Sequence, residues 1–385
     1  VGTPGVLIVK KTLVNQVNAP SRSGGGTVFY VTNNHHRFLS NRIERYEGGT
    51  PNVAGIIRCG LTFLLKRKTE ERYLLAAEKE GVPPTLLEYE YSTYRQVVRT
   101  LKERAPNLLL LGDGSSEHLP ILPFLIRCGR RFLHYNYVCA VLNDVFGIQS
   151  RGGCQCSGPY SQRLLGLTEM THDGIEVPNG VNEQVEYALV HFKERAELLR
   201  PGFTRLSLPF KGLRDEEVAY VVKALEWVSN HGWALMCQYR CNHRTGEWRH
   251  SNRQGKPLGT QRKWLSHYDI LPTEKQDTPM TIENKRTVLE VLNQTMLNAD
   301  ALLYEAKRDH RFIAQAFKMN EAGESLGQDD AMLEQLRWFV YPKECSIWLT
   351  QKLESPPETR SHEILGALRP LVIGLDEVDP LDVES

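Results

Sequence analysis

The stretch Arg151-Gly-Gly-Cys-Gln-Cys-Ser-Gly-Pro159 places two thiols, an arginine and three glycines within nine residues. The apolar residues from Leu133 to Gly147 recur at helical spacing, and Ile148 to Ser150 is typical of a short strand. Glycine-rich backbone lets a loop approach a ligand closely. A thiol on such a loop, beside a cation, can be held as thiolate, its reactive form. The stretch therefore predicts a reactive loop; the alternative is a tight turn with two buried cysteines.

Composition sets the broad class of the chain. Its 385 residues suffice for two domains or one large one, and 41% hydrophobic with 24% charged residues is ordinary for a globular protein. Lysine and arginine number 47 against 46 acidic residues, so charge gives no argument for nucleic acid. No apolar run could span a bilayer, and no signal peptide stands at the start. We expect neither nucleic acid nor a membrane as partner, and no metal.

The eight cysteines are sparse and lie mostly in apolar runs, as in a reducing compartment. Cys237, Cys241 and His243 have the spacing of metal ligands, but no fourth ligand is evident nearby. The first residue is Val1 rather than methionine, so we expect a fragment or a processed chain.

Strands and helices alternate along the chain. We expect strands over Val6–Val9, Thr27–Val31, Asn107–Leu111, Pro120–Ile126 and Phe203–Phe210. Thr50 and Pro51 are typical of an N-cap and a first helical position, and Val53, Ile56, Ile57, Leu61 and Leu64 then share one helical face. Further helices are expected over Leu86–Arg104, Leu133–Phe146, Asn182–Leu199, Asp215–Asn230, Thr281–Phe317 and Met332–Phe339, with Gly232 as a stop signal.

Five motifs in order carry a family resemblance. They are Gly2-Thr-Pro-Gly-Val-Leu7, Glu47-Gly-Gly-Thr-Pro-Asn52, Leu142-Asn-Asp-Val-Phe-Gly147, the stretch from Arg151 to Pro159, and Thr204-Arg-Leu-Ser207 before an Asp-Glu-Glu-Val helix. Together they resemble the C-terminal part of a class V aminotransferase, in the branch that includes the cysteine desulfurases. The resemblance runs from Val1 to about Trp233, and more weakly to about Pro342.

The resemblance implies a fold and a domain plan. The family uses pyridoxal 5'-phosphate, has the type I aminotransferase fold and forms an obligate dimer. We therefore expect an α/β chain with a truncated type I fold. Residues 1–70 would end the large cofactor-binding domain, and 71–240 would form the α+β small C-terminal domain. Residues 241–280 would be a loop or insertion, 281–345 a helical region, and 346–385 a disordered tail.

The resemblance also assigns roles. Gly49 and Thr50 would reach the cofactor phosphate of the neighbouring subunit; the alternative for Thr50 is a plain N-cap. Arg205 would bind the substrate carboxylate, unless it is a surface salt bridge. Cys156 would attack the substrate sulfur and become a persulfide, or else would only line the pocket. Cys154 would share the sulfur or be inert, and Arg151, on the substrate side, would favour the thiolate or only hold the loop.

The lysine that forms the Schiff base lies, in this family, just before the segment resembling Gly2-Thr-Pro-Gly5, so we expect it to be missing and this fragment alone to be inactive. We interpret the chain as part of an enzyme that acts on an amino acid and resembles the cysteine desulfurases. We expect a cytoplasmic homodimer, with a mitochondrial location as the alternative, and a sulfur-acceptor protein as a possible partner. One alternative is a class V aminotransferase or another pyridoxal-phosphate eliminase. The other is a non-catalytic homologue that serves as a dimerisation or binding module.

Overall fold

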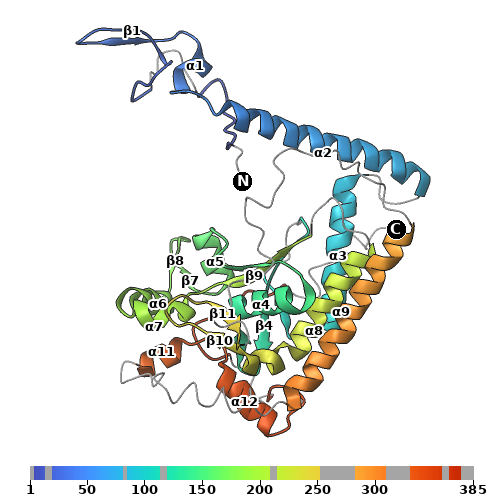
Figure 1. Cartoon of the computed structure of the whole chain (residues 1–385). Helices are drawn as coiled ribbons and strands as arrows, with labels where there is room; N and C mark the ends of the chain where they lie inside the picture. The colour runs from blue at the N-terminus through green and yellow to red at the C-terminus, as the bar shows by residue number, and fades with distance from the viewer. Residues whose placement is uncertain are drawn as a thin grey trace. The chain divides into compact units, whose positions relative to one another are not determined.

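A computed structural model describes residues 4–13, 20–80, 85–112, 119–208, 215–251, 282–308, 330–357 and 364–373. The chain divides into two compact units, Val1–Tyr89 and Glu90–Ser385 (Figure 1). The predicted boundary at residue 70 is wrong, because helix α2 (Val53–Glu80) continues through it without a break.

The first unit is built from a hairpin and two helices. Strands β1 (Val28–Val31) and β2 (His36–Phe38) pair antiparallel, which confirms the strand predicted over Thr27–Val31. Helix α1 (Arg42–Tyr46) follows, and the Asn41 side chain accepts a hydrogen bond from its first turn. Residues 6–9 form no strand, and Val6, Leu7 and Ile8 are largely exposed, so the prediction of a buried strand there is wrong.

Helix α2 begins later than the sequence suggests. Its N-cap is Asn52, whose Oδ1 accepts from the Gly55 N–H at 3.0 Å and whose carbonyl accepts from Ile56 at 2.9 Å. Thr50 lies outside the helix, so its predicted capping role is wrong; asparagine is the stronger N-cap residue. The predicted apolar face exists, but its side chains stay 36% to 59% exposed. They are Val53, Ile56, Ile57, Leu61 and Leu64.

The second unit contains an antiparallel sheet of order β3-β4-β9-β6, with β5 paired to β4. Its strands are β3 (Leu108–Leu110), β4 (Ile121–Cys128), β5 (Arg131–Leu133), β6 (Arg151–Gly153) and β9 (Phe203–Ser207). The predicted strands in this region are confirmed, except that the one expected at Ile148–Ser150 lies three residues later, as β6. The mixed architecture with antiparallel sheets agrees with the α/β expectation.

The long helices of this unit pack on the sheet or on one another. They are α3 (Leu86–Arg104), α4 (Tyr135–Phe146), α8 (Asp215–Leu235) and α9 (Ile282–Arg308), each near its predicted position. Helix α4 contacts both β6 and β9, and α8 and α9 run side by side (Figure 1). The prediction that Gly232 ends α8 is wrong, because Gly232 lies buried inside that helix. Its carbonyl accepts the Tyr137 hydroxyl at 2.5 Å, so the glycine serves close packing.

Shorter elements surround this core. In chain order they are α5 (Gly158–Leu164), the hairpin of β7 (Thr168–Met170) and β8 (Glu176–Pro178), α6 (Gly180–His191), α7 (Lys193–Ala196), η1 (Glu197–Leu199), η2 (Met236–Gln238), the hairpin of β10 (Tyr239–Cys241) and β11 (Trp248–His250), α11 (Asp330–Leu336) and α12 (Pro342–Thr350). The β10–β11 hairpin enters the segment predicted as a loop, of which residues 252–281 lie outside the described part.

The C-terminal segment is packed rather than disordered as far as residue 373. The Ile373 N–H donates to the Leu110 carbonyl at 3.1 Å, and Val372 bridges Leu111. Leu368 is fully buried. The prediction of a disordered tail over 346–385 is therefore wrong for residues 346–357 and 364–373, because apolar side chains there complete the core; residues 358–363 and 374–385 lie outside the described part.

A buried ionic network joins this end of the chain to the sheet. The Arg337 guanidinium, 7% exposed, contacts Glu334 at 2.6 Å and Glu344 at 2.7 Å, and Arg131 contacts Glu334 at 2.8 Å. Burial raises the pKa of the Glu334 carboxyl, but the two arginines outweigh it and hold that pKa below its usual range. Removing either glutamate would leave the buried Arg337 guanidinium with one carboxylate fewer.

Candidate functional site

Two arginines face each other where β6 pairs with β9. The antiparallel register places Arg151 directly opposite Arg205, so their side chains share one face of the sheet. Like charges directly opposite each other are unfavourable unless an anion lies between them. These residues stand 54 positions apart in sequence, and the register of the two strands brings them together.

Arg205 carries an unmet hydrogen-bond donor. It is half-buried, and its Nε is shielded from solvent with no acceptor among the described residues. A buried donor without a partner costs about 1–3 kcal/mol. A carboxylate can take two parallel hydrogen bonds from one guanidinium, and Arg205 carries that group on the sheet face that it shares with Arg151. The donor set therefore fits the carboxylate of an amino acid.

Cys156 contacts Arg151. The Arg151 Nη2 donates to the Cys156 Sγ at 2.7 Å, and both side chains are exposed. A neighbouring guanidinium stabilises a thiolate, which is the nucleophilic form of cysteine. The contact thus links the sheet face that carries Arg151 and Arg205 to an accessible sulfur.

The loop that presents Cys156 has an unusual backbone. Gln155 and Cys156 both adopt left-handed conformations, with φ of 58° and 61°. Such a conformation costs a residue other than glycine roughly 1–2 kcal/mol. The Ser157 and Ser161 hydroxyls donate to the Cys154 carbonyl at 3.1 and 2.6 Å, and these bonds hold the turn into α5. The side chain of Gln155, a residue that the sequence analysis did not single out, makes three further hydrogen-bond contacts that hold this turn.

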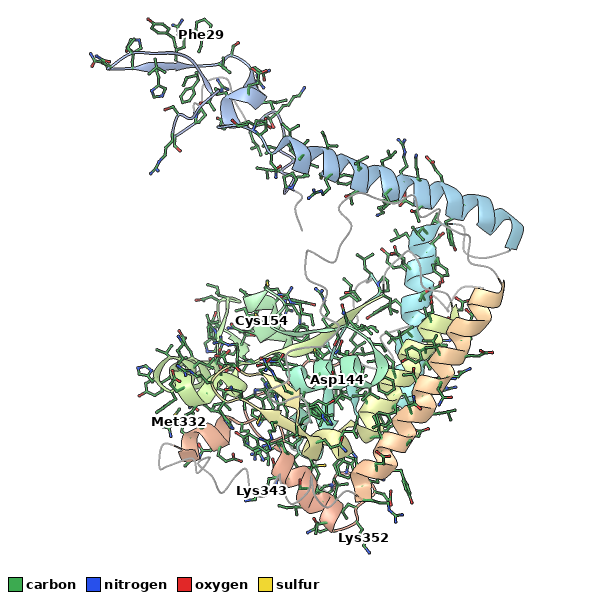
Figure 2. The ribbon with its side chains drawn as sticks, viewed as in Figure 1. Phe29, Asp144, Cys154, Met332, Lys343 and Lys352 are labelled. Atoms are coloured by element: carbon green, nitrogen blue, oxygen red, sulfur yellow. The ribbon has the colours of Figure 1, made fainter. Side chains whose placement is uncertain are left out.

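Cys154 lies in different surroundings. It is exposed beside α5 (Figure 2) and interacts electrostatically with Tyr135 and Arg200. The Arg200 guanidinium already forms a bidentate pair with Glu197 at 2.6 and 2.9 Å. The two loop thiols therefore have different charged neighbours, although only Gln155 separates them.

A third thiol near the loop is kept protonated. Cys139 on α4 is half-buried, and burial raises the pKa of its thiol, while the nearby hydroxyls of Ser150 and Thr204 act in the opposite direction. Its Sγ would lie 3.4 Å from a side chain at Gly152. Cys139 therefore packs the base of the loop and is no candidate nucleophile.

Gly49 and Thr50 belong to the first unit. Gly49 has a φ of 87°, and its N–H donates to the Gly25 carbonyl at 2.8 Å. A phosphate bound by this amide would have to replace that bond. Thr50 is exposed on the turn before α2. The exposed hydroxyl suits an anion near a helix N-terminus, so the predicted phosphate contact rests on Thr50 more than on Gly49.

The described residues contain no group of three His, Cys, Asp or Glu side chains placed to hold a metal ion. Cys237, of the Cys237-Cys241-His243 spacing, is buried and donates to the Ala234 carbonyl at 3.5 Å. Among the helices of the described ranges, none has the length and apolar character needed to cross a membrane.

Comparison with known families places part of the chain beside one family. Residues 2–172 match the family model of class-V aminotransferases. The match includes Arg151, Cys154 and Cys156, whereas Arg205 lies beyond it. Class-V aminotransferases are generally pyridoxal-phosphate-dependent enzymes. The search of curated proteins gave no match.

Proposed function

We propose that this chain supplies the substrate side of a pyridoxal-phosphate enzyme that removes sulfur from cysteine. The observation that carries the proposal is the single face formed by Arg205, Arg151 and Cys156. An unmet guanidinium donor suits a substrate carboxylate, and an accessible thiol on a cation suits attack at sulfur. The class-V aminotransferase match supports the cofactor.

Each residue has a defined role in this reaction. Arg205 binds and orients the substrate carboxylate. The Cys156 thiolate attacks the substrate sulfur, so that an S–S bond forms as the carbon–sulfur bond breaks. The carbon gains the proton that the thiol gave up, and the products are alanine and a Cys156 persulfide. When bound, pyridoxal phosphate supplies the electron sink. Thr50, more than Gly49, would contact its phosphate.

The assembly is part of the proposal. We propose a cytoplasmic homodimer in which the exposed apolar face of α2 is covered by a second copy, as the family resemblance suggests. A contiguous row of exposed apolar side chains is typical of an interface. The sulfur would leave Cys156 for an acceptor protein, because the thiol is exposed enough to be reached.

The test uses a form of the protein that includes the Schiff-base lysine, loaded with pyridoxal phosphate and given cysteine. We expect alanine in solution and a persulfide on the peptide that carries Cys156, read by mass spectrometry. Cys156→Ser should lower alanine formation by at least about a hundredfold, because a hydroxyl is a far weaker nucleophile near neutral pH. Cys154→Ser is the matched control and should retain most of the activity.

The outcomes separate the alternatives. Undiminished alanine formation in the Cys156→Ser variant would show that Cys156 is not the nucleophile. A keto acid without alanine in the unmodified protein would favour transamination, and no turnover of any amino acid would favour the non-catalytic homologue.

A further inference from the structure

We propose that Gln155 is a positioning residue that sets the reactivity of Cys156 by locking the loop between β6 and α5. The catalytic meaning of this lock rests on the proposed function, whereas the lock itself can be measured on the thiol alone. No other residue of the loop bonds to both strands that carry the two arginines.

The lock consists of one amide group and three carbonyls. The Gln155 Nε2 donates to the carbonyl of Arg151 at 3.1 Å, to that of Gly153 at 3.2 Å and to that of Phe203 at 3.3 Å. Two of these carbonyls belong to β6 and one to β9. The amide has two N–H bonds, so one of them is shared between two of these carbonyls.

The amide is committed to donation. Its Oε1 is buried, and no donor among the described residues reaches it. The opposite orientation of the amide would place this oxygen against three carbonyl oxygens and is therefore excluded. A side chain that leaves one of its own atoms unpaired in order to hold the backbone indicates a positional constraint.

The bonds form a closed ring with the candidate nucleophile. The Arg151 carbonyl accepts from Gln155, the next residue is Cys156, and the Cys156 Sγ accepts from the Arg151 guanidinium at 2.7 Å. Both Gln155 and Cys156 have left-handed backbones that relax to other conformations when nothing holds them. Opening the ring at Gln155 should therefore carry the Cys156 sulfur away from Arg151.

The experiment measures alkylation of individual cysteines by iodoacetamide between pH 6 and 9, with peptide mass spectrometry as the readout. The quantity of interest is the rate at Cys156 divided by the rate at Cys154. We expect Gln155→Met to lower this ratio about tenfold near pH 7, because the Cys156 sulfur loses its contact with the Arg151 guanidinium. Gln162→Met on the adjacent α5 is the matched control and should leave the ratio unchanged.

The ring also predicts coupling. Arg151→Met should lower the ratio by a similar factor, and the double variant should lower it no further than either single one, because each change opens the same ring. If the Gln155→Met chain fails to fold, Gln155→Asn replaces it, since its shorter amide cannot span the three carbonyls.

An unchanged ratio in the folded Gln155 variant would overturn the proposal, and so would two effects that simply multiply in the double variant. The proposed function is judged separately, by alanine formation in the cofactor-loaded protein. Coupled effects on alkylation without alanine formation would support the role of Gln155 and contradict the desulfurase proposal. Alanine formation with uncoupled effects on alkylation would support the desulfurase proposal and contradict the role of Gln155.

Discussion

His134 lies at the centre of the second unit with both ring nitrogens engaged. Its Nδ1 accepts from the Asn136 N–H at 3.1 Å and so caps α4, and its Nε2 donates to the Leu198 carbonyl at 3.2 Å. The ring stacks on Trp338 with centroids 5.1 Å apart. Burial lowers the pKa of His134 to about 3, and the bond to Leu198 opposes that shift only in part.

The first prediction concerns stability in acid. The folded state holds His134 neutral, whereas the unfolded chain binds a proton near pH 6.5, so stability present above pH 6.5 is lost as the pH falls toward 3. Between pH 7 and pH 5 this group should remove about 2 kcal/mol from the free energy of unfolding. His134→Asn keeps a capping acceptor without titrating there, and should reduce the loss measured by urea unfolding by that amount.

Exposed His172 provides the control, since His172→Asn should leave the pH dependence of unfolding as it is. An equal loss in the His134→Asn and unmodified chains would show that His134 is protonated in the folded protein.

Single residues differ in how far their sequence context reveals them. Cys154, Cys156 and Arg151 form a local motif, and Arg205 follows a recognisable strand pattern, so all four could be chosen as candidates beforehand. The Arg151–Arg205 pairing could not, because it depends on the register of strands far apart in the chain. The roles of Gln155 and His134 are decided by atoms contributed from Phe203 and Leu198, which no local pattern contains.

At the scale of elements, three glycines allow β6 to pack tightly between α4 and β9. A side chain at Gly152 would lie 2.6 Å from the Tyr135 ring. One at Gly202 would lie 2.7 Å from both the Tyr135 ring and the Gly153 backbone. Gly153 has a φ of 113°. The loop that carries Cys156 therefore starts from a strand whose position depends on the absence of side chains.

The second prediction follows from this packing. Gly202→Ala should destabilise the second unit by about 1–3 kcal/mol, because the backbone of Gly153 cannot move aside without separating β6 from β9. Urea unfolding measures the loss. Gly180→Ala at the start of α6, where a side chain meets nothing within 4 Å, should be neutral or slightly stabilising. Equal stability of the Gly202→Ala chain would show that the strands can part at this point.

Most elements with a strong period could be predicted, including α3 from Leu86 to Arg104 with its exact bounds. The errors occur where tertiary contacts decide. Residues 6–9 have strand composition, yet among the described residues no strand pairs with them. Gly232 resembles a helix stop, but packing against Tyr137 keeps it inside α8. The residues after 346 are rich in proline and acidic side chains. Their apolar residues are too scattered in the sequence for a place in the core to be predicted from them.

At the scale of the whole molecule, the two units differ in how much they bury. The hydrophobic core runs from Tyr94 to Ile373 and draws on the sheet, α3, α4, α8 and the C-terminal segment. The described residues before Tyr89 contribute few buried side chains, namely Thr27, Arg45 and Leu86. Hydrophobic burial is the main favourable contribution to folding, so stability should reside in the second unit.

The last prediction is that a chain of residues 85–385 folds without the rest. It keeps Thr85, whose hydroxyl accepts from the Glu88 N–H at 3.1 Å and donates to the Glu88 carboxylate at 2.7 Å, so α3 retains its capping box. We expect the midpoint of thermal unfolding, followed by circular dichroism, to stay within a few degrees of that of the whole chain. Sedimentation should show a monomer, because the proposed dimer face on α2 has been removed. A shortened chain that unfolds at much lower temperature would show that the first unit completes the core, and one that still dimerises would move the interface away from α2.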